Sequence, residues 1–163
     1  MNRTDVLELA ATYPLETLEP GQTLIIGGKA HHPLYVLASG RLQVEQDGRY
    51  IATIDVPGSI VGELSLLLHT AASADVVAKT PVEVRRVDDA DTLLDEHPEI
   101  MRFLAETLAL RLRRMTTYLV DLQVQFSDQP GTLGLVGEVL ENLLHTGSPT
   151  AEPGSEREPD SPY

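Results

Sequence analysis

The chain has 163 residues, enough for one ordinary domain with a single core, and it contains no cysteine, which excludes disulfides and thiolate metal sites. Its 25 acidic and 12 basic residues give a formal net charge of −13, and an acidic surface repels phosphate backbones, so nucleic-acid binding is not expected. The N-terminus lacks the apolar run of a signal peptide and no segment reaches the roughly 18 apolar residues of a membrane span, so we expect a cytoplasmic protein without a membrane partner.

The first part of the chain predicts one short helix followed by strands. The helix is expected at residues 4–11, with Thr4 as its N-cap. Residues 15–87 then form short β runs separated by turn residues, and Asp47-Gly48 between two alternating runs is the strongest hairpin signal. Many short strands at regular spacing predict a sandwich or a closed barrel. The runs are LETLE, QTLII, LYVLA, RLQVEQ, RYIATID, ADVVAK and VEVRRV.

After residue 87 the hydrophobic period becomes helical. A short helix is expected in DDADTLLDEH, capped by Asp88 or Asp89, and Pro98 suits the first position of a long helix over residues 98–126. Apolar residues recur along the long helix at alternating spacings of four and three, which is a heptad seam. The seam consists of Met101, Ala105, Leu108, Leu112, Met115, Leu119, Leu122 and Phe126.

The long helix carries a second apolar set, so one stripe can cover the barrel while the other meets a partner helix. The alternative is one wide stripe that faces the core of a monomer. Because the seam is longer than a small barrel could cover, we favour a homodimer. The second set is Ile100, Phe103, Leu104 and Leu110. The expected dimer interface is Leu108, Leu112, Met115, Leu119 and Leu122.

Beyond the long helix, the sequence predicts little packed structure. Residues 127–146 are expected to form a linker and a short helix with an apolar face. The tail 147–163 has four prolines and no aliphatic residue larger than alanine, so we expect it to be an acidic, disordered segment.

Motifs of catalysis and metal binding are absent from the sequence. It has no Gly-x-Ser-x-Gly elbow, P-loop or Gly-x-Gly-x-x-Gly, so we do not expect an enzyme. His31 and His32 are adjacent in a predicted turn, and the other three histidines look isolated. Surface or capping roles therefore suit the histidines better than metal binding, and no metal site is expected.

Residues 19–67 carry a family resemblance. The segment EPGQTLIIGGKAHHPLYVLASGRLQVEQDGRYIATIDVPGSIVGELSLL resembles the cyclic nucleotide-binding domain of bacterial catabolite activator regulators and kinase regulatory subunits. HPEIMRFLAETLALRLRR resembles the long dimer helix of that family. The resemblance covers about residues 10–126. It implies an eight-stranded jelly-roll barrel with flanking helices, so we place the domain at residues 1–126. The turns of the family are matched by Gly21, Gly28, Gly40, Gly48, Gly58 and Gly62.

The segment GELSLLLHTAASAD, residues 62–75, resembles the family's phosphate-binding cassette. That cassette reads roughly Gly-Glu-[Leu/Ile]-[Ala/Ser]-Leu-Leu, then Pro-Arg-[Ala/Ser]-Ala-[Thr/Ser]. The Glu accepts a hydrogen bond from the ribose 2′-hydroxyl, backbone amides point at the phosphate, and the Arg neutralises the phosphate. The residues that match this pattern are Gly62, Glu63, Leu64, Ser73 and Ala74. The candidate ligand-binding residues of the cassette are Gly62, Glu63, Leu64, Ala72 and Ser73.

The cassette departs from the family pattern at its phosphate end. Ala71 replaces the Pro, Ala72 replaces the Arg, and Asp75 replaces the Thr. A charge-assisted hydrogen bond contributes about 1.5–3 kcal/mol, so losing the Arg costs about one to two decades of affinity. Asp75 adds a negative charge near the expected phosphate. A cyclic monophosphate should therefore be disfavoured.

The long helix supplies three further candidates for the ligand site. Arg111 belongs to an arginine cluster that is either a solvated flank of the helix or a source of a cation for Glu63. By resemblance, Arg111 stands where the family has an arginine that pairs with the cassette Glu. The resemblance also implies that Thr116 and Thr117 stand where the family's helix meets the purine of the ligand, although both residues also suit ordinary exposed positions.

Bacterial members of the family continue into a helix-turn-helix domain. Here LVGEVLENLLH resembles the first helix of that domain and is followed by the acidic tail, so no recognition helix is expected. We therefore expect a stand-alone regulatory or interaction module without a resident cofactor, homodimeric, with weak or no binding of cyclic AMP or cyclic GMP. The alternative is a cyclic nucleotide sensor that acts on a partner protein.

Overall fold

A computed structural model describes residues 1–30 and 33–125. It divides into two units, residues 1–108 and a second that begins at residue 109. The helix expected within 127–146, the tail 147–163, Phe126, His31 and His32 lie outside the described residues. The domain boundaries expected from the sequence stay predictions.

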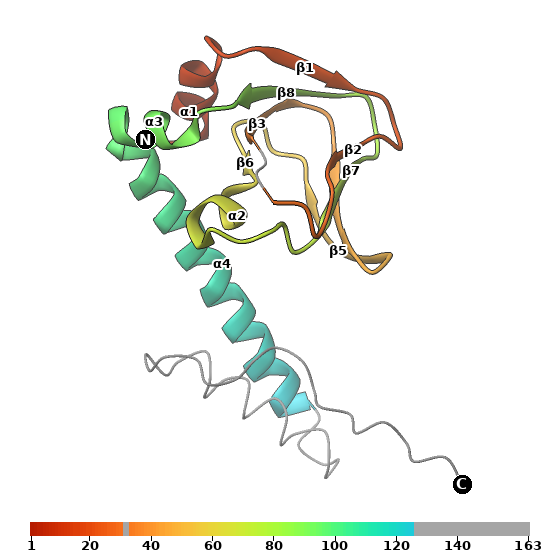
Figure 1. The fold of residues 1–163 in the computed structure, drawn as a ribbon. Helices are drawn as coiled ribbons and strands as arrows, with labels where there is room; N and C mark the ends of the chain where they lie inside the picture. The colour runs from red at the N-terminus through yellow and green to blue at the C-terminus, as the bar shows by residue number, and fades with distance from the viewer. Residues whose placement is uncertain (31–32, 126–163) are drawn as a thin grey trace, which may run out of the picture. The chain divides into compact units, whose positions relative to one another are not determined.

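Two four-stranded antiparallel sheets form the first unit (Figure 1). The first sheet has the order β1-β8-β3-β6, and the second has the order β2-β7-β4-β5. The expected mainly β domain, with eight strands in the described part, flanking helices and a long C-terminal helix, is confirmed. The strands are β1 Leu15–Leu18, β2 Thr23–Ile25, β3 Leu34–Ser39, β4 Leu42–Gln46, β5 Arg49–Ile54, β6 Ile60–Val61, β7 Asp75–Ala78 and β8 Val82–Val87.

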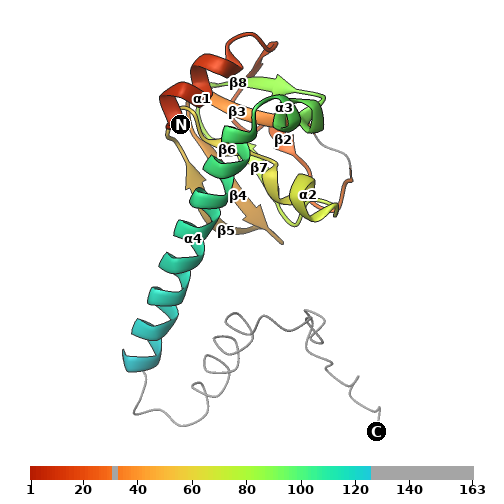
Figure 2. The same cartoon turned by 90° about the vertical axis from the view of Figure 1, so that its left-hand side faces the viewer.

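Strand β3 is buried on both faces because it lies between two apolar layers. Tyr35 and Leu37 belong to the core that both sheets share. Leu34 and Val36 point the other way and pack under the helices α1 (Arg3–Ala10) and α3 (Ala90–Glu96), which Figure 2 shows in front of the first sheet. Alternating side chains thus serve two cores.

Helix α1 begins earlier than the sequence pattern indicates. The expected N-cap Thr4 is wrong, because Asn2 takes that position. The Asn2 Oδ1 accepts hydrogen bonds from the Thr4 amide at 2.7 Å and the Asp5 amide at 3.2 Å. The Asp5 carboxylate accepts in return from the Asn2 amide at 2.7 Å. This reciprocal capping box uses more of the free amides than a cap at Thr4 would.

Two other local expectations are confirmed. Asp47 and Gly48, with φ values of 51° and 71°, make the turn between β4 and β5. Positive φ at both central residues gives the turn the twist that an antiparallel hairpin needs. Asp89 is the N-cap of α3 and accepts from the Thr92 amide at 3.1 Å.

The long helix α4, Pro98–Gln125, begins at the expected proline. In the first unit its early residues Ile100 and Leu104 are buried in the apolar layer with α1 and α3. Both residues belong to the set that lies off the heptad seam, so that set contributes to the core. Among the described helices, none is both long and apolar enough to cross a membrane.

Candidate functional site

The cassette begins at a short helix, α2 (Glu63–Leu68). Gly62 caps α2 with φ of 98°, a left-handed conformation that glycine adopts without steric cost. Glu63 is the first residue of α2 and is only 6% exposed, the one buried charged residue in the described part of the first unit. Leu64 is exposed. The expected ribose-binding carboxylate therefore lies inside the protein.

The other end of the cassette turns an alanine methyl group into the core. Ala72 is 7% exposed and belongs to the apolar cluster between the two sheets, together with Tyr35 and Val61. Its carbonyl accepts from the Gly28 amide at 2.7 Å, and its own amide donates to the Lys29 carbonyl at 3.0 Å. The side chain at position 72, where the resemblance leads us to expect the family's arginine, is thus buried among apolar neighbours.

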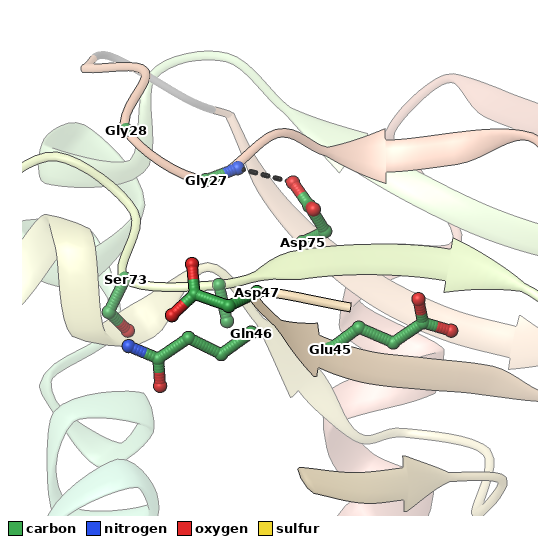
Figure 3. A pocket seen from close by; sticks show the side chains of 8 residues that line it. Gly27, Gly28, Glu45, Gln46, Asp47, Ser73 and Asp75 are labelled. Carbon is green, nitrogen blue, oxygen red and sulfur yellow. Dashed lines mark hydrogen bonds between the residues drawn. The ribbon is translucent and has the colours of Figure 1, made fainter. Parts of the chain in front are cut away.

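A pocket of about 250 Å³ opens beside this end of the cassette (Figure 3). Three elements that are distant in sequence form it: the turn after β2, the β4–β5 hairpin and the start of β7. Three of its side chains are carboxylates, and the rest are polar or small, which makes the pocket acidic. The lining residues are Gly27, Gly28, Glu45, Gln46, Asp47, Ser73, Ala74 and Asp75.

Two of the carboxylates have close partners. Asp75 Oδ1 accepts from the Gly27 amide at 2.7 Å, the contact drawn in Figure 3. Glu45 Oε1 lies 2.7 Å from the Lys79 ammonium and accepts from the Gln43 amide group at 2.8 Å. Both carboxylates are therefore engaged within the protein. Within the described residues, no group of three or more His, Cys, Asp or Glu is arranged to hold a metal ion.

The helix candidates belong to the second unit. Arg111 and Thr117 are exposed and Thr116 is half-buried. The hydroxyls of Thr116 and Thr117 donate to the carbonyls of Leu112 and Arg113, each at 3.0 Å, one helical turn earlier. Such bonds within the helix are typical of threonine, so the hydroxyl positions do not by themselves favour a purine contact. The roles of Arg111, Thr116 and Thr117 stay predictions.

Comparison with known families agrees with the fold. Residues 15–94 match the model of the cyclic nucleotide-binding domain. Through these residues the chain belongs to that family. The match includes both sheets and the whole cassette. It describes a regulatory binding domain.

Curated relatives and a solved structure extend this result. The chain is 36% identical over 119 residues to the CRP-like cAMP-activated global transcriptional regulator of Mycobacterium tuberculosis, covering 68% of this chain and 51% of the regulator. It is 33% identical over 128 residues to the acetyltransferase Pat of Mycolicibacterium smegmatis, covering 76% of this chain and 38% of Pat. The catabolite activator protein of Thermus thermophilus shares the fold, with a TM-score of 0.61, 24% identity, and coverage of 86% and 81% of the two chains. The chain spans about half, or less, of the length of these curated relatives.

No sequence pattern points to the acidic pocket as a unit. Asp75 departs from the family pattern expected in the sequence, but its partner Gly27 is 48 residues away and donates through the backbone. The hairpin signal at Asp47-Gly48 places Asp47 at a turn without indicating which segment the turn faces. Only the pairing of β4 and β2 with β7 brings the three segments together.

Proposed function

We propose that this cyclic nucleotide-binding domain is a regulatory or interaction module that binds cyclic AMP and cyclic GMP weakly or not at all. Ala72 carries the proposal, because its methyl group is buried and the sequence resemblance assigns position 72 to the phosphate-binding arginine of the family. The module is neither a catalyst nor a DNA-binding protein in this proposal. A net charge of −13 supports the second point.

Electrostatics beside Ala72 add to the loss of the arginine. A cyclic phosphate is an anion, and the pocket next to Ala72 contains the carboxylates of Glu45, Asp47 and Asp75. Two like charges about 6 Å apart repel by about 3 kcal/mol at an effective dielectric constant of about 20. An anion near this end of the cassette would meet repulsion without a cassette cation to offset it.

Helix α4 supports homodimerisation as part of the same proposal. In the second unit, Leu112 and Met115 of the predicted seam are 46% and 59% exposed, and Leu119 and Leu122 are half-buried. Leu108, the last residue of the first unit, is also half-buried. Exposed leucine and methionine at heptad spacing are typical of a helix that packs on a second copy.

Titration calorimetry with cyclic AMP and cyclic GMP tests the proposed function. We expect that the unmodified chain does not bind either nucleotide with a Kd smaller than about 10 μM. Ala72→Arg should strengthen binding at least about tenfold, which is the effect of one charge-assisted hydrogen bond. Ala71→Arg is the matched control, because it adds the same charge one residue away on an exposed side chain. Tight binding by the unmodified chain would refute the proposal.

The alternative function, a sensor of a small molecule that acts on a partner protein, is favoured by one observation. Glu63 is retained and buried at the start of α2, where it suits a ribose hydroxyl. A less anionic ligand would use Glu63 without needing an arginine at position 72. Adenosine, which has the ribose hydroxyls and no phosphate, distinguishes the two functions, since only the sensor should bind it more tightly than cyclic AMP.

A further inference from the structure

The Asp75 side chain closes the phosphate end of the cassette against a neighbouring turn. Asp75 is the first residue of β7, and its carboxylate is directed at the Gly27 amide, 2.7 Å away (Figure 3). The turn lies so close that a Cβ atom on Gly27 would be 3.3 Å from the Ala74 carbonyl carbon and 3.4 Å from Asp75 Oδ1. Turn and cassette are in direct contact.

Two backbone hydrogen bonds lie beside this contact. The Gly28 amide donates to Ala72, and the Ala72 amide donates to Lys29. Residues 27–29, which we call the Gly27 turn, are therefore fastened to the end of the cassette by three hydrogen bonds. Only the bond to Asp75 is made by a side chain, so a substitution at position 75 can remove this bond and leave the two backbone bonds in place.

An aspartate at position 75 has an energetic cost. Asp75 lies directly opposite Glu45 in the antiparallel pair of β7 and β4. Like charges in that arrangement destabilise a sheet. Glu45 is offset by Lys79 and Gln43, and Asp75 is offset by the Gly27 amide. A carboxylate makes a stronger hydrogen bond to an amide than a neutral oxygen does. The negative charge at position 75 therefore strengthens the bond to the Gly27 amide.

We propose that the Asp75 carboxylate is a negative charge that the protein itself supplies at the phosphate end of the cassette. This carboxylate holds the Gly27 turn on the cassette when no ligand is bound. It also disfavours the binding of cyclic phosphates at the site. The proposal deepens the proposed function and rests on it. The missing arginine removes attraction for a phosphate, and Asp75 supplies both the repulsion and a closed conformation that no ligand is needed to assemble.

Amide hydrogen exchange, followed by NMR on the full chain, tests the structural half. Asp75→Ala should make the Gly27 amide exchange about tenfold faster, the effect of one lost hydrogen bond. Asp75→Asn keeps an oxygen acceptor and should change the exchange less. Asp47→Asn removes a charge from the same pocket and should leave the Gly27 amide unchanged. Unaltered Gly27 exchange in Asp75→Ala would overturn the proposal.

Two controls keep this experiment decisive. The Val84 amide in β8 reports on the whole fold, and its protection should be the same in every variant. If Asp75→Ala also exposes Val84, the comparison is made between Asp75→Asn and Asp47→Asn, which preserve side-chain size. Equal Gly27 exchange in those two variants would then count against a role for the Asp75 charge.

Binding tests the specificity half. In the Ala72→Arg background, Asp75→Asn should strengthen cyclic AMP binding about tenfold further, and Asp47→Asn should strengthen it less. No added affinity, or no detectable binding in either double variant, would overturn the specificity assignment. Tight binding by the unmodified chain would instead refute the proposed function, while hydrogen exchange would still decide whether Asp75 holds the turn.

Discussion

Gly40 is a position that leaves no room for a side chain. Its φ is 91°, and a Cβ atom there would lie 2.3 Å from the Pro81 carbonyl oxygen and 2.8 Å from Val82 Cα. Both neighbours are backbone at the start of β8, so neither can rotate away. The close approach lets β3 and β8 remain paired up to the end of β3.

Gly40→Ala should therefore destabilise the domain by more than about 2 kcal/mol, from left-handed strain and overlap together. Gly48→Ala is the matched control, because Gly48 also has a positive φ but a Cβ atom there meets nothing within 4 Å. The control should lose only about 1 kcal/mol. Urea unfolding measures the free energy of unfolding of both variants. Equal losses would show that the backbone moves to remove the overlap at Gly40, and would contradict the prediction.

The buried phenol of Tyr35 leads us to predict that the stability of the folded chain depends on pH in the alkaline range. Burial, with the negative charge of Glu16 as a smaller cause, raises the pKa of its phenol above the ordinary value of 10.0. A raised folded-state pKa gives stability that is fully present below pH 10.0 and is lost as pH rises through the folded-state pKa. Ultraviolet difference titration of the native chain against Tyr35→Phe should show the Tyr35 phenol ionising above pH 10.0. Ionisation at or below that pH would contradict the prediction.

At the scale of elements, helix α4 separates two uses of its apolar residues. Ile100 and Leu104 are buried in the core of the first unit, whereas in the second unit Leu112 and Met115 of the heptad seam are exposed and Leu119 and Leu122 are half-buried. In a heptad that places Leu112 at position a, Leu110 falls at position f, on the opposite side of the helix. The two leucines are similarly exposed, at 46% and 44%.

Leu112→Glu should therefore abolish the proposed dimer, while Leu110→Glu should leave it intact. Both variants add one charge to the same helix, so a general effect of charge or of helix propensity acts on both. Light scattering reports the mass directly. A halved mass in both variants, or in neither, would contradict the seam as the interface.

The elements show what the sequence could predict. Strand runs and the Asp47-Gly48 turn were predictable because alternation and turn chemistry are local signals. Strand β6 has only two residues, both buried, so no alternation marks it. The capping box at Asn2 was missed because Thr4 and Asn2 are both good caps and the choice depends on which amides each reaches. The contact of Asp75 with Gly27 depends on tertiary pairing, which no local pattern contains.

At the scale of the whole molecule, the charge of the chain predicts how it responds to salt. A net charge of −13 makes the folded state repel itself, and this repulsion is screened by dissolved ions. Exposed ion pairs such as Arg102–Glu106 contribute little to stability, so the loss of their attraction in salt is small.

The thermal midpoint should therefore rise when ionic strength is raised from about 0.01 M to about 0.15 M, over which the Debye length falls from about 30 Å to about 8 Å. Scanning calorimetry in sodium chloride and in potassium chloride measures this rise, and the two salts should agree. A midpoint that falls with salt would show that ion pairs outweigh the net repulsion.

The position of β8 in the first sheet has a consequence for the order of folding. It is the last strand of the described chain to be synthesised, yet it lies between β1 and β3 and pairs with both. Leu15 is paired with Arg85, so β1 has no neighbour in this sheet until residues 82–87 exist. A nascent chain that ends before residue 82 cannot complete the sheet, and closure of the barrel must wait for its final strand.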